Sequence, residues 1–353
     1  MNLKDGVKTA ENKVSTEARR LSDMVKDSNK SLVDRLECFE DIISLEVGDT
    51  GLHRAKTLER EFNVRQLYLK YEGDNPTGTQ KDRIAFAQLY DALRREFTVV
   101  SLATCGNYGV AMALASDLAG IACKIYIPES YHTDRVVEME ALNAEIIRIP
   151  GSYEDVVTES SKLAAEHGWY DANPGGANTP LQISAYAQIA QEIFEDLGDA
   201  PKYCAVPVSN GTLFAGIYRG FVNLYKRGKT SRIPKMIAAS SSHKNPIVES
   251  YLQGLDHCKD LNPAAIKETK YNEPLINWHS FDGEEALYAL QDSEGEAFNI
   301  SDKKLKEMTS LLHKKEGFRI LPASTAGLIG LLELDEKMNF EPDRFVAVLT
   351  AKN

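Results

Sequence analysis

The chain has few cysteines, and their arrangement indicates neither a disulfide framework nor a metal site. Its 353 residues include five cysteines, an odd number without any Cys-x-x-Cys pair. The seven histidines form no His-Glu-x-x-His sequence, so we expect no bound metal ion. Scattered cysteines are typical of proteins kept in a reducing compartment, and we therefore expect a cytoplasmic location.

Basic charge and long apolar runs are also scarce. Acidic residues outnumber basic ones by 52 to 41, and this net charge of −11 argues against a nucleic-acid or anionic membrane partner. No apolar run is long enough to span a bilayer, and residues 1–26 are too charged for a signal peptide. The spacings GxxxxGK[ST] and GxGxxG are missing, so the sequence does not indicate a nucleotide site.

What is present is the pattern of an ordinary globular α/β protein, 43% hydrophobic and 26% charged, and long enough for two domains. Residues 1–36 are polar, and we interpret them as a solvated N-terminal helical arm. Beyond them, strand-like and helix-like segments alternate, which predicts parallel sheets built from βαβ units. We expect strands at 97–103, 121–128, 144–149, 203–208, 318–321 and 344–350, and helices at 109–119, 132–142, 153–168, 301–317 and 326–334. We expect Ser152 to cap the helix that runs to Gly168.

One lysine occupies an unusual position. Residues 67–69 have a strand pattern and residues 85–97 a helical one, and Asn75-Pro76 with Gly78 makes the turn between them. Thr79 and Asp82 have the spacing of a capping box, which places Lys81 in the first helical turn. The helix dipole disfavours a cation there and favours the neutral amine, the form that a Schiff-base lysine needs. A surface lysine is the alternative.

A second candidate feature follows the expected strand at residues 203–208. Ser209, Asn210, Gly211 and Thr212 turn the chain into a helix that carries Leu213 and further apolar residues on one face. A strand, a short glycine-containing turn and a helix N-terminus together form a cradle of N–H groups for a phosphate. Because nucleotide motifs are missing, this turn suggests a phosphorylated cofactor.

These pieces resemble one known family, the threonine synthases, which are fold-type II enzymes that depend on pyridoxal phosphate (PLP). The resemblance rests on five segments in the family's order: Gly48–Leu52, Asn75–Arg83 with its lysine, the asparagine loop Thr104–Asn107, the phosphate loop Pro207–Thr212, and the strand Val348–Thr350. In the first of them Gly51 stands where the family usually has proline.

The resemblance implies a fold of two doubly wound, mostly parallel α/β subdomains with PLP in the cleft between them. Residues 37–90 and 186–353 would form a large PLP-binding domain, residues 91–185 a small mobile domain, and residues 1–36 the arm. It also implies a homodimer and a small amino-acid substrate, with no nucleic-acid or membrane partner.

The resemblance further implies the roles of individual residues. Lys81 would form the Schiff base with PLP and then move protons as a free base. A neutral hydroxyl at the ring nitrogen suits elimination and replacement reactions, whereas an aspartate would suit aminotransferases. The implied cofactor-binding residues are Lys81, Asn107, Ser209, Asn210, Gly211, Thr212 and Thr350. The implied substrate-binding residues are Thr79, Thr104, Cys105, Gly106, Asn107 and Asp171.

The substrate-phosphate site departs from the family pattern. Threonine synthases carry Asn-Ser-x-Asn-Pro-x-Arg where this chain has Tyr170–Gly176, so the first Asn, the Ser and the Arg have become Tyr170, Asp171 and Gly176. A carboxylate near a phosphate is repulsive, and each lost charge-assisted bond is worth roughly 1.5–3 kcal/mol. Lys244, Arg135 or His132 are the cations that could replace the arginine. Gln80 and Cys105 also differ from the usual Phe and Ser or Thr.

Several interpretations remain open. Conversion of O-phosphohomoserine and water to threonine and phosphate is the first reaction to consider. The second is β-replacement or β-elimination on a serine or threonine derivative, as in cysteine synthases and dehydratases. A binding or regulatory protein without catalysis is a third. Plain structural roles are expected alternatives for single residues: Cys105 as a packed hydrophobe, Asp171 as a turn cap, Ser324 as a helix cap, and Tyr108 and Tyr186 as core.

Overall fold

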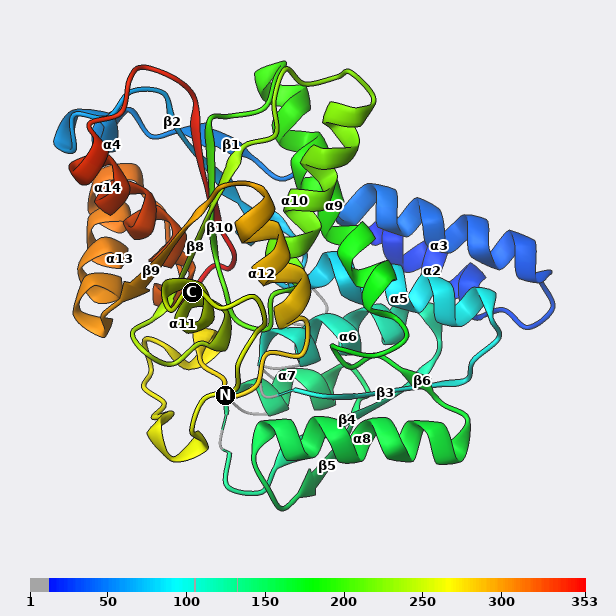
Figure 1. Cartoon of the computed structure of the whole chain (residues 1–353). Helices are drawn as coiled ribbons and strands as arrows, with labels where there is room; N and C mark the ends of the chain where they lie inside the picture. The colour runs from blue at the N-terminus through cyan, green and yellow to red at the C-terminus, as the bar shows by residue number, and fades with distance from the viewer. Residues whose placement is uncertain (1–12, 105, 132) are drawn as a thin grey trace. The chain divides into compact units, whose positions relative to one another are not determined.

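The computed structural model describes residues 13–104, 106–131 and 133–353, and the chain divides into two compact units. The first consists of the described residues up to Gly48 together with Asn75–Gln182, and the second of Asp49–Asp74 and Ile183–Asn353. Each unit is built around one sheet (Figure 1). The predicted arm, large domain and mobile domain, with boundaries at 36/37, 90/91 and 185/186, stay predictions.

The sheet of the first unit has four parallel strands in the order β5-β4-β3-β6. Its strands are β3 (Val99–Ala103), β4 (Ala122–Pro128), β5 (Glu145–Ile149) and β6 (Tyr170–Asp171). Its helices are α2 (Thr16–Lys26), α3 (Leu32–Glu46), α5 (Lys81–Arg94), α6 (Asn107–Ala119), α7 (Arg135–Ala141) and α8 (Tyr153–His167). Because the chain advances from β3 to β5 and then returns to β6, right-handed crossovers place α6 and α7 on one face and α8 on the other, as in Figure 1.

Helix α8 shows the predicted caps at both of its ends. The Ser152 hydroxyl accepts from the backbone N–H of Asp155, and the Asp155 carboxylate accepts from the backbone N–H of Ser152, which makes a capping box at the start of α8. Gly168 ends the helix in the left-handed region at φ 66°. The predicted helix from Ser152 to Gly168 is therefore confirmed.

The N-terminal segment differs from the solvated helix expected for it. Helix α2 buries Leu21 and Val25, and the Ser22 hydroxyl donates to the carbonyl of Leu118 in α6 at 2.9 Å. An amphipathic helix whose apolar face is buried gains stability that a solvated arm lacks. The described part of this segment is thus packed into the first unit.

The sheet of the second unit has six strands in the order β1-β2-β10-β7-β8-β9, and only the β1–β2 pair is antiparallel. Its strands are β1 (Leu52–Arg54), β2 (Leu67–Tyr71), β7 (Tyr203–Pro207), β8 (Lys235–Ser241), β9 (Glu296–Ile300) and β10 (Phe345–Leu349). Its helices are α4 (Lys56–Glu61), α10 (Thr212–Lys226), α11 (Pro246–Leu252), α12 (Gly283–Asp292), α13 (Asp302–Glu316) and α14 (Ala326–Met338), and α9 (Thr179–Leu197) leads into this unit. Short 3-10 turns are η1 (Glu72–Asp74), η2 (Pro263–Ala265), η3 (Glu273–Leu275) and η4 (Pro322–Thr325).

Helices cover both faces of this sheet. Figure 1 shows α13 and α14 on one side of the strands and α10 and α12 on the other. Side chains of β2, β7, β8, β9 and β10 form one buried cluster with α4, α13 and α14. Strands buried on both faces read as near-continuous apolar runs, and the five residues of β10 are all buried.

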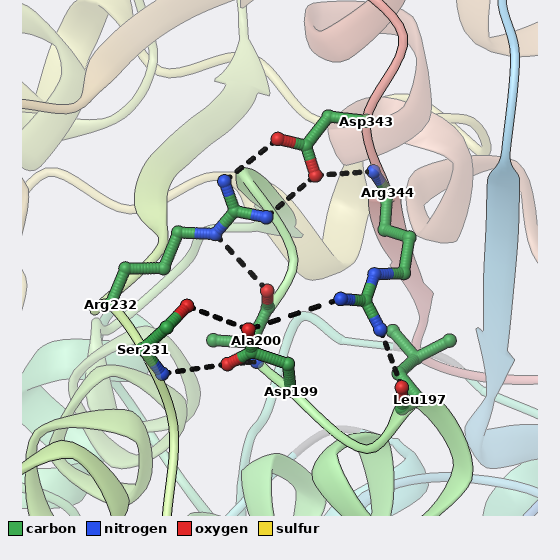
Figure 2. Close-up of polar contacts among 7 residues, drawn as sticks. All are labelled: Leu197, Asp199, Ala200, Ser231, Arg232, Asp343 and Arg344. Atoms are coloured by element: carbon green, nitrogen blue, oxygen red, sulfur yellow. Dashed lines mark hydrogen bonds and ion pairs between the residues drawn. The ribbon is translucent and has the colours of Figure 1, made fainter. Parts of the chain in front are cut away.

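An ion-pair cluster at the amino ends of β7 and β10 joins three segments of this unit (Figure 2). The guanidinium of Arg232 donates two hydrogen bonds to the Asp343 carboxylate, at 2.7 and 2.6 Å. Ser231 donates to Asp199 through its N–H at 2.8 Å and its hydroxyl at 2.6 Å. Burial acts to raise the pKa of Asp343, but the hydrogen bonds from Arg232 and from the backbone N–H of Arg344, together with the charges of Arg232 and Lys202, hold that pKa below its ordinary value. The cluster lies at the edge of the sheet opposite the carboxyl ends of the strands.

One predicted strand is wrong. Residues 318–321 form no strand; the only pairing there is an isolated bridge between Ile320 and Lys352. In the described ranges, no helix has the length and apolar character to cross a membrane.

Candidate active site

Lys81 is the first residue of α5, at the end of a tight turn in the first unit. Gly78 enters this turn in the left-handed region at φ 82°, and the backbone N–H of Lys81 faces the Thr79 hydroxyl at 3.4 Å. The side chain is half-buried, with its Nζ 5.4 Å from the centre of the Tyr108 ring. The amine therefore lies beside the first turn of α6.

The predicted capping box at Thr79 and Asp82 is wrong. The Asp82 carboxylate instead accepts from the backbone N–H of Thr77 and from the Thr77 hydroxyl, both at 2.9 Å, and α5 has no side-chain cap. The turn at Gly78 brings Thr77 over the carboxylate, while the Thr79 hydroxyl donates to Gln80 at 2.7 Å. Burial raises the pKa of Asp82 to about 7, although the bonds from Thr77 act to lower it.

The asparagine loop follows β3 in the same unit. The backbone N–H of Thr104 donates to Tyr126 in β4 at 3.1 Å, and the Thr104 hydroxyl accepts from the N–H of Gly106 at 3.4 Å. A Cβ at Gly106 would meet no atom within 4 Å, so the space beside it is open. Cys105 and His132, both named in the sequence-based predictions, lie outside the described residues.

Asn107 begins α6 and has a cationic partner. Its side-chain oxygen accepts from the Arg135 guanidinium at 2.7 Å, which leaves the Asn107 amide nitrogen to donate elsewhere. Arg135 also pairs with Glu138 at 3.3 Å, and Lys13 pairs with the same carboxylate at 3.0 Å. Lys13 and Arg135 thus pair with the same carboxylate next to the asparagine loop. Lys244, another candidate cation, donates to the carbonyl of Lys267.

The segment at residues 170–176 is tied to the sheet. The Asp171 carboxylate accepts from the backbone N–H of Asn173 at 3.0 Å and from its amide at 2.7 Å, so the turn-cap interpretation is confirmed. The Asn173 oxygen accepts in turn from the N–H of Ala103 at 2.7 Å. A Cβ at Gly176 would lie 3.7 Å from the Asp171 carboxylate, which shows how near the two replaced positions are. Contact of Asp171 with substrate stays a prediction.

A buried polar network lies under these loops. The Tyr108 hydroxyl donates to the carbonyl of Ala172 at 2.7 Å and accepts from Gln88 at 2.6 Å, and Gln182 donates to Gln88 at 3.1 Å. Burial raises the pKa of Tyr108 well above its ordinary value, so the hydroxyl stays protonated, as expected of a structural residue. The sequence-based prediction did not include Gln88 and Gln182. The signal was a polar residue at a position where helical periodicity requires an apolar one.

In the second unit, Ser209–Gly211 connect β7 to α10 as predicted. Gly211 is left-handed at φ 101°, and a Cβ there would come within 2.6 Å of the Asp282 carbonyl. The Thr212 hydroxyl donates to the Asp282 carboxylate, and the Asn210 oxygen accepts from Asn277 at 3.1 Å. Because α10 begins at Thr212, the N–H groups of its first turn have no acceptor within the helix. A glycine-containing turn that leads into a helix N-terminus fits a phosphate.

Thr350 lies at the carboxyl end of β10. Since β10 and β7 are parallel neighbours, Thr350 and the turn at Ser209 are on the same edge of the sheet. The Thr350 and Ser324 hydroxyls lie 2.8 Å apart, and Ser324 accepts from the N–H of Ala351 at 3.0 Å. The predicted helix-capping role of Ser324 is wrong, because its partners are Thr350 and Ala351, which follow β10. Two neutral hydroxyls fit a ring nitrogen that is not forced to protonate.

Another buried lysine is engaged in an ion pair. Lys70, on β2, is fully buried, and its Nζ lies 2.6 Å from the Glu192 carboxylate and 2.5 Å from the carbonyl of Thr50. Both contacts fix this amine between acceptors of its own unit. The assignment of the Schiff base to Lys81 stays a prediction.

Solved structures share this architecture. Maize serine racemase superposes with a TM-score of 0.74 at 18% identity, covering 91% of this chain and 94% of that one. Threonine deaminase isoform 2 from Solanum lycopersicum gives 0.71 at 18% identity, covering 93% and 90%. At such identities the likeness shows the fold alone, and it confirms the predicted fold-type II α/β class.

Proteins of similar sequence show the family to which the chain belongs. The chain is 30% identical over 311 residues to the threonine synthase of Methanocaldococcus jannaschii, covering 88% of this chain and 75% of that protein. It is 28% identical over 303 residues to the threonine synthase of Mycobacterium tuberculosis, covering 85% and 80%. The family model described as "Pyridoxal-phosphate dependent enzyme" matches residues 43–351. These matches confirm the predicted resemblance, the cofactor PLP and the assignment to the PLP-dependent lyases. The chain belongs to the family of pyridoxal-phosphate dependent enzymes.

Proposed function

We propose that this enzyme eliminates a leaving group from an amino acid and adds water, and that its substrate is O-phosphohomoserine, which it converts to threonine and phosphate. The observation that carries this proposal is the Arg135–Asn107 contact of 2.7 Å. It puts a guanidinium beside the asparagine loop, although residues 170–176 lack the arginine that threonine synthases have there. The relatives named threonine synthases support the same reaction.

The proposal gives each residue a task. Lys81 would bind the carbonyl carbon of PLP and, once released, take and return protons as a base. Thr79, Thr104, Cys105, Gly106 and Asn107 would hold the substrate carboxylate, with Asp171 beside it. The Ser209–Thr212 turn would bind the cofactor phosphate and Thr350 the ring nitrogen. PLP supplies the electron sink, while the protein positions it and the substrate.

Arg135 suits an anionic substrate for an electrostatic reason. It shares Glu138 with Lys13, so its charge is only partly compensated. Arginine binds phosphate through two parallel N–H bonds, which fixes the orientation of the group as well as its charge. A neutral leaving group would not need this residue.

A second reaction is favoured by one observation. Gly176 stands beside Asp171, with its Cβ position 3.7 Å from the carboxylate, so no cation offsets that charge within the segment. Such a site tolerates a neutral or acetylated leaving group better than a phosphate. β-Replacement or β-elimination on a serine or threonine derivative is therefore the competing proposal.

Product analysis distinguishes the two reactions. The purified PLP-loaded protein is incubated separately with O-phosphohomoserine, O-acetylserine, serine and threonine, and phosphate, threonine and 2-oxo acid are measured. Equal amounts of phosphate and threonine from O-phosphohomoserine support the proposal. Release of 2-oxo acid from serine or threonine, with no threonine formed from O-phosphohomoserine, would establish the competing reaction.

We also propose a homodimer located in the cytoplasm, and a small domain at residues 91–185 that closes over the substrate. Closure would exclude water and order the loop at Thr104–Asn107. Light scattering of the purified protein tests the dimer. Hydrogen exchange of residues 91–185 with and without substrate tests the closure, which predicts slower exchange when substrate is bound.

A further inference from the structure

Three asparagine side chains in the second unit form a continuous line of hydrogen bonds that ends at the phosphate turn. Asn245 is fully buried and Asn277 is 3% exposed. The Asn245 amide nitrogen donates to the Asn277 oxygen at 3.1 Å, and the Asn277 amide nitrogen donates to the Asn210 oxygen at 3.1 Å. The Asn277 nitrogen shares its two hydrogens between this oxygen, the carbonyl of His279 at 3.0 Å and the hydroxyl of Ser280 at 2.9 Å. Buried amides in such a line are stable only when every donor meets an acceptor.

The direction of this line is set at its far end. Asn245 precedes α11, and its oxygen accepts from the backbone N–H groups of Ile247 and Val248 at 3.1 and 3.3 Å. A backbone N–H can only donate, so the Asn245 oxygen must face the helix and its amide nitrogen must face Asn277. The same reasoning then turns the Asn277 nitrogen toward Asn210.

The orientation of Asn277 determines which group of the Asn210 side chain can meet a ligand. The Asn210 oxygen is occupied by Asn277, so the Asn210 amide nitrogen is the group left for a ligand. Asn210 is half-buried, and within the described residues its amide nitrogen has no hydrogen-bond acceptor. A dianionic phosphate offers only acceptors, so it gains from a donor and is repelled by an amide oxygen.

The same side chains also hold the backbone of the turn. Asn245 donates to the carbonyl of Ser209 at 3.0 Å, and the backbone N–H of Asp282 donates to the carbonyl of Asn210 at 3.1 Å. With these carbonyls engaged behind the turn, its N–H groups are directed the other way. Rigid support of this kind removes the ordering cost that a flexible loop would add to binding.

We propose that Asn277 and Asn245 are positioning residues for the cofactor phosphate: they fix the Asn210 amide so that it presents N–H donors and not its oxygen. The proposal rests on the assignment of Ser209–Thr212 as the phosphate-binding turn. It identifies the loop before α12, where the sequence shows no motif, as part of the cofactor site.

Dissociation constants of PLP and of pyridoxal, which lacks the phosphate, provide the test. Both are titrated into apoenzyme and followed by absorbance. Their ratio, pyridoxal over PLP, reports the contribution of the phosphate alone. In Asn277→Asp, a carboxylate of the same shape replaces the amide donor, so Asn210 turns its nitrogen inward and its oxygen toward the phosphate. We expect the ratio to fall about 10- to 100-fold, with the constant for pyridoxal within about twofold of the parent.

Three further variants separate the role of Asn277 from effects of added charge and of folding. Asn277→Leu keeps the shape without adding charge, and we expect the ratio to fall in the same direction. Ser293→Ala removes another buried hydroxyl, bonded to Leu290 and to the N–H of Met236, and should leave the ratio unchanged. Should Asn277→Asp fail to fold, Asn245→Asp breaks the line one residue farther away and should lower the ratio as well.

Two outcomes would overturn the proposal. One is an unchanged ratio in folded Asn277→Asp and Asn277→Leu, which would give Asn277 a purely structural role. The other is equal affinity of the parent protein for PLP and pyridoxal, which would remove the phosphate site from this turn. Neither measurement uses an amino-acid substrate, so the outcome does not depend on the proposed reaction.

Discussion

The guanidinium of Arg135 donates a hydrogen bond of 2.7 Å to the side-chain oxygen of Asn107, the first residue of α6. This contact joins a cation to the loop that the family resemblance assigns to the substrate carboxylate. It also fixes the Asn107 amide so that its nitrogen remains available to donate. The proposed preference for a phosphorylated substrate depends on this pair.

Replacement of Arg135 by glutamine should weaken binding of O-phosphohomoserine. Loss of a hydrogen bond to a charged group costs about 1.5–3 kcal/mol, or roughly 10- to 100-fold in KM. The expected effect on kcat is smaller, because the guanidinium would bind the ground state and the transition state alike. Steady-state kinetics with O-phosphohomoserine measure both constants.

Arg94→Gln is the matched control, since Arg94 lies at the other end of α5 and pairs with Asp91 on the surface. Its kinetics should equal those of the parent. An Arg135→Gln enzyme with unchanged KM for O-phosphohomoserine would remove the residue from the substrate site.

Stability should depend on pH through Asp82. Its pKa lies at about 7 in the folded protein and near 3.8 in the unfolded chain, so between these values the folded state binds more protons. Stability from this group is therefore fully present below pH 4 and is lost as the pH rises to 7, by something of the order of 4 kcal/mol. Urea unfolding at pH values from 5 to 8 measures the trend.

Asp82→Asn removes this titration while keeping an acceptor for Thr77. The free energy of unfolding of the variant should fall less steeply than that of the parent between pH 5 and 7. Identical slopes in the two proteins would show that Asp82 is already ionised in the folded state.

Gly211→Ala should impair both folding and cofactor binding. The left-handed backbone costs a residue with a Cβ about 1–2 kcal/mol, and that atom would approach the Asp282 carbonyl to 2.6 Å. Gly228 is also left-handed, at φ 67°, but its Cβ would meet nothing within 4 Å. Gly228→Ala thus isolates the backbone cost.

Thermal unfolding and PLP titration of both variants separate the two effects. We expect similar backbone penalties, with an additional loss of stability and weaker PLP binding in Gly211→Ala alone. Equal PLP affinity in the two variants would contradict the assignment of Gly211 to the phosphate turn.

Tyr108→Phe should lower stability without removing the cofactor. The change removes the bond of the hydroxyl to the carbonyl of Ala172 at 2.7 Å and its bond from Gln88 at 2.6 Å, which costs about 1–3 kcal/mol. The Gln88 amide keeps its bond to the carbonyl of Ile84 at 3.1 Å. The ring beside the Lys81 amine is retained. Chemical denaturation measures the loss, and the visible absorption of the PLP-loaded variant should match that of the parent; a lost absorption band would give the hydroxyl a direct role at the cofactor.

Local sequence patterns were sufficient for much of the fold. Alternating strand and helix segments predict parallel sheets, and Ser152 with Gly168 predicts both ends of α8, because these signals depend only on neighbouring residues. The Thr79–Asp82 spacing failed for the same reason: it fits a capping box, but the backbone turn at Gly78 brings Thr77 closer. The spacing of residues in the sequence does not reveal the path of the backbone at Gly78.

The polar residues that hold the phosphate turn in place could not be predicted from the sequence. Asn245, Asn277 and Asp282 come from segments far from Ser209 in sequence, and an isolated Asn or Asp in a loop is most often a turn residue. Ser324 was interpreted as a cap because Pro322 precedes it, whereas its partner is Thr350, 26 residues away. Such long-range contacts depend on strand order, which local patterns do not encode.

Chemical trapping of the cofactor tests the central claim most directly. The PLP-loaded protein is reduced with borohydride, digested with a protease, and searched by mass spectrometry for a phosphopyridoxyl-lysine. We predict one labelled peptide, with the modification on Lys81, and no label in Lys81→Ala. A label on Lys70 or another lysine, or an unlabelled protein after incubation with PLP, would contradict the account.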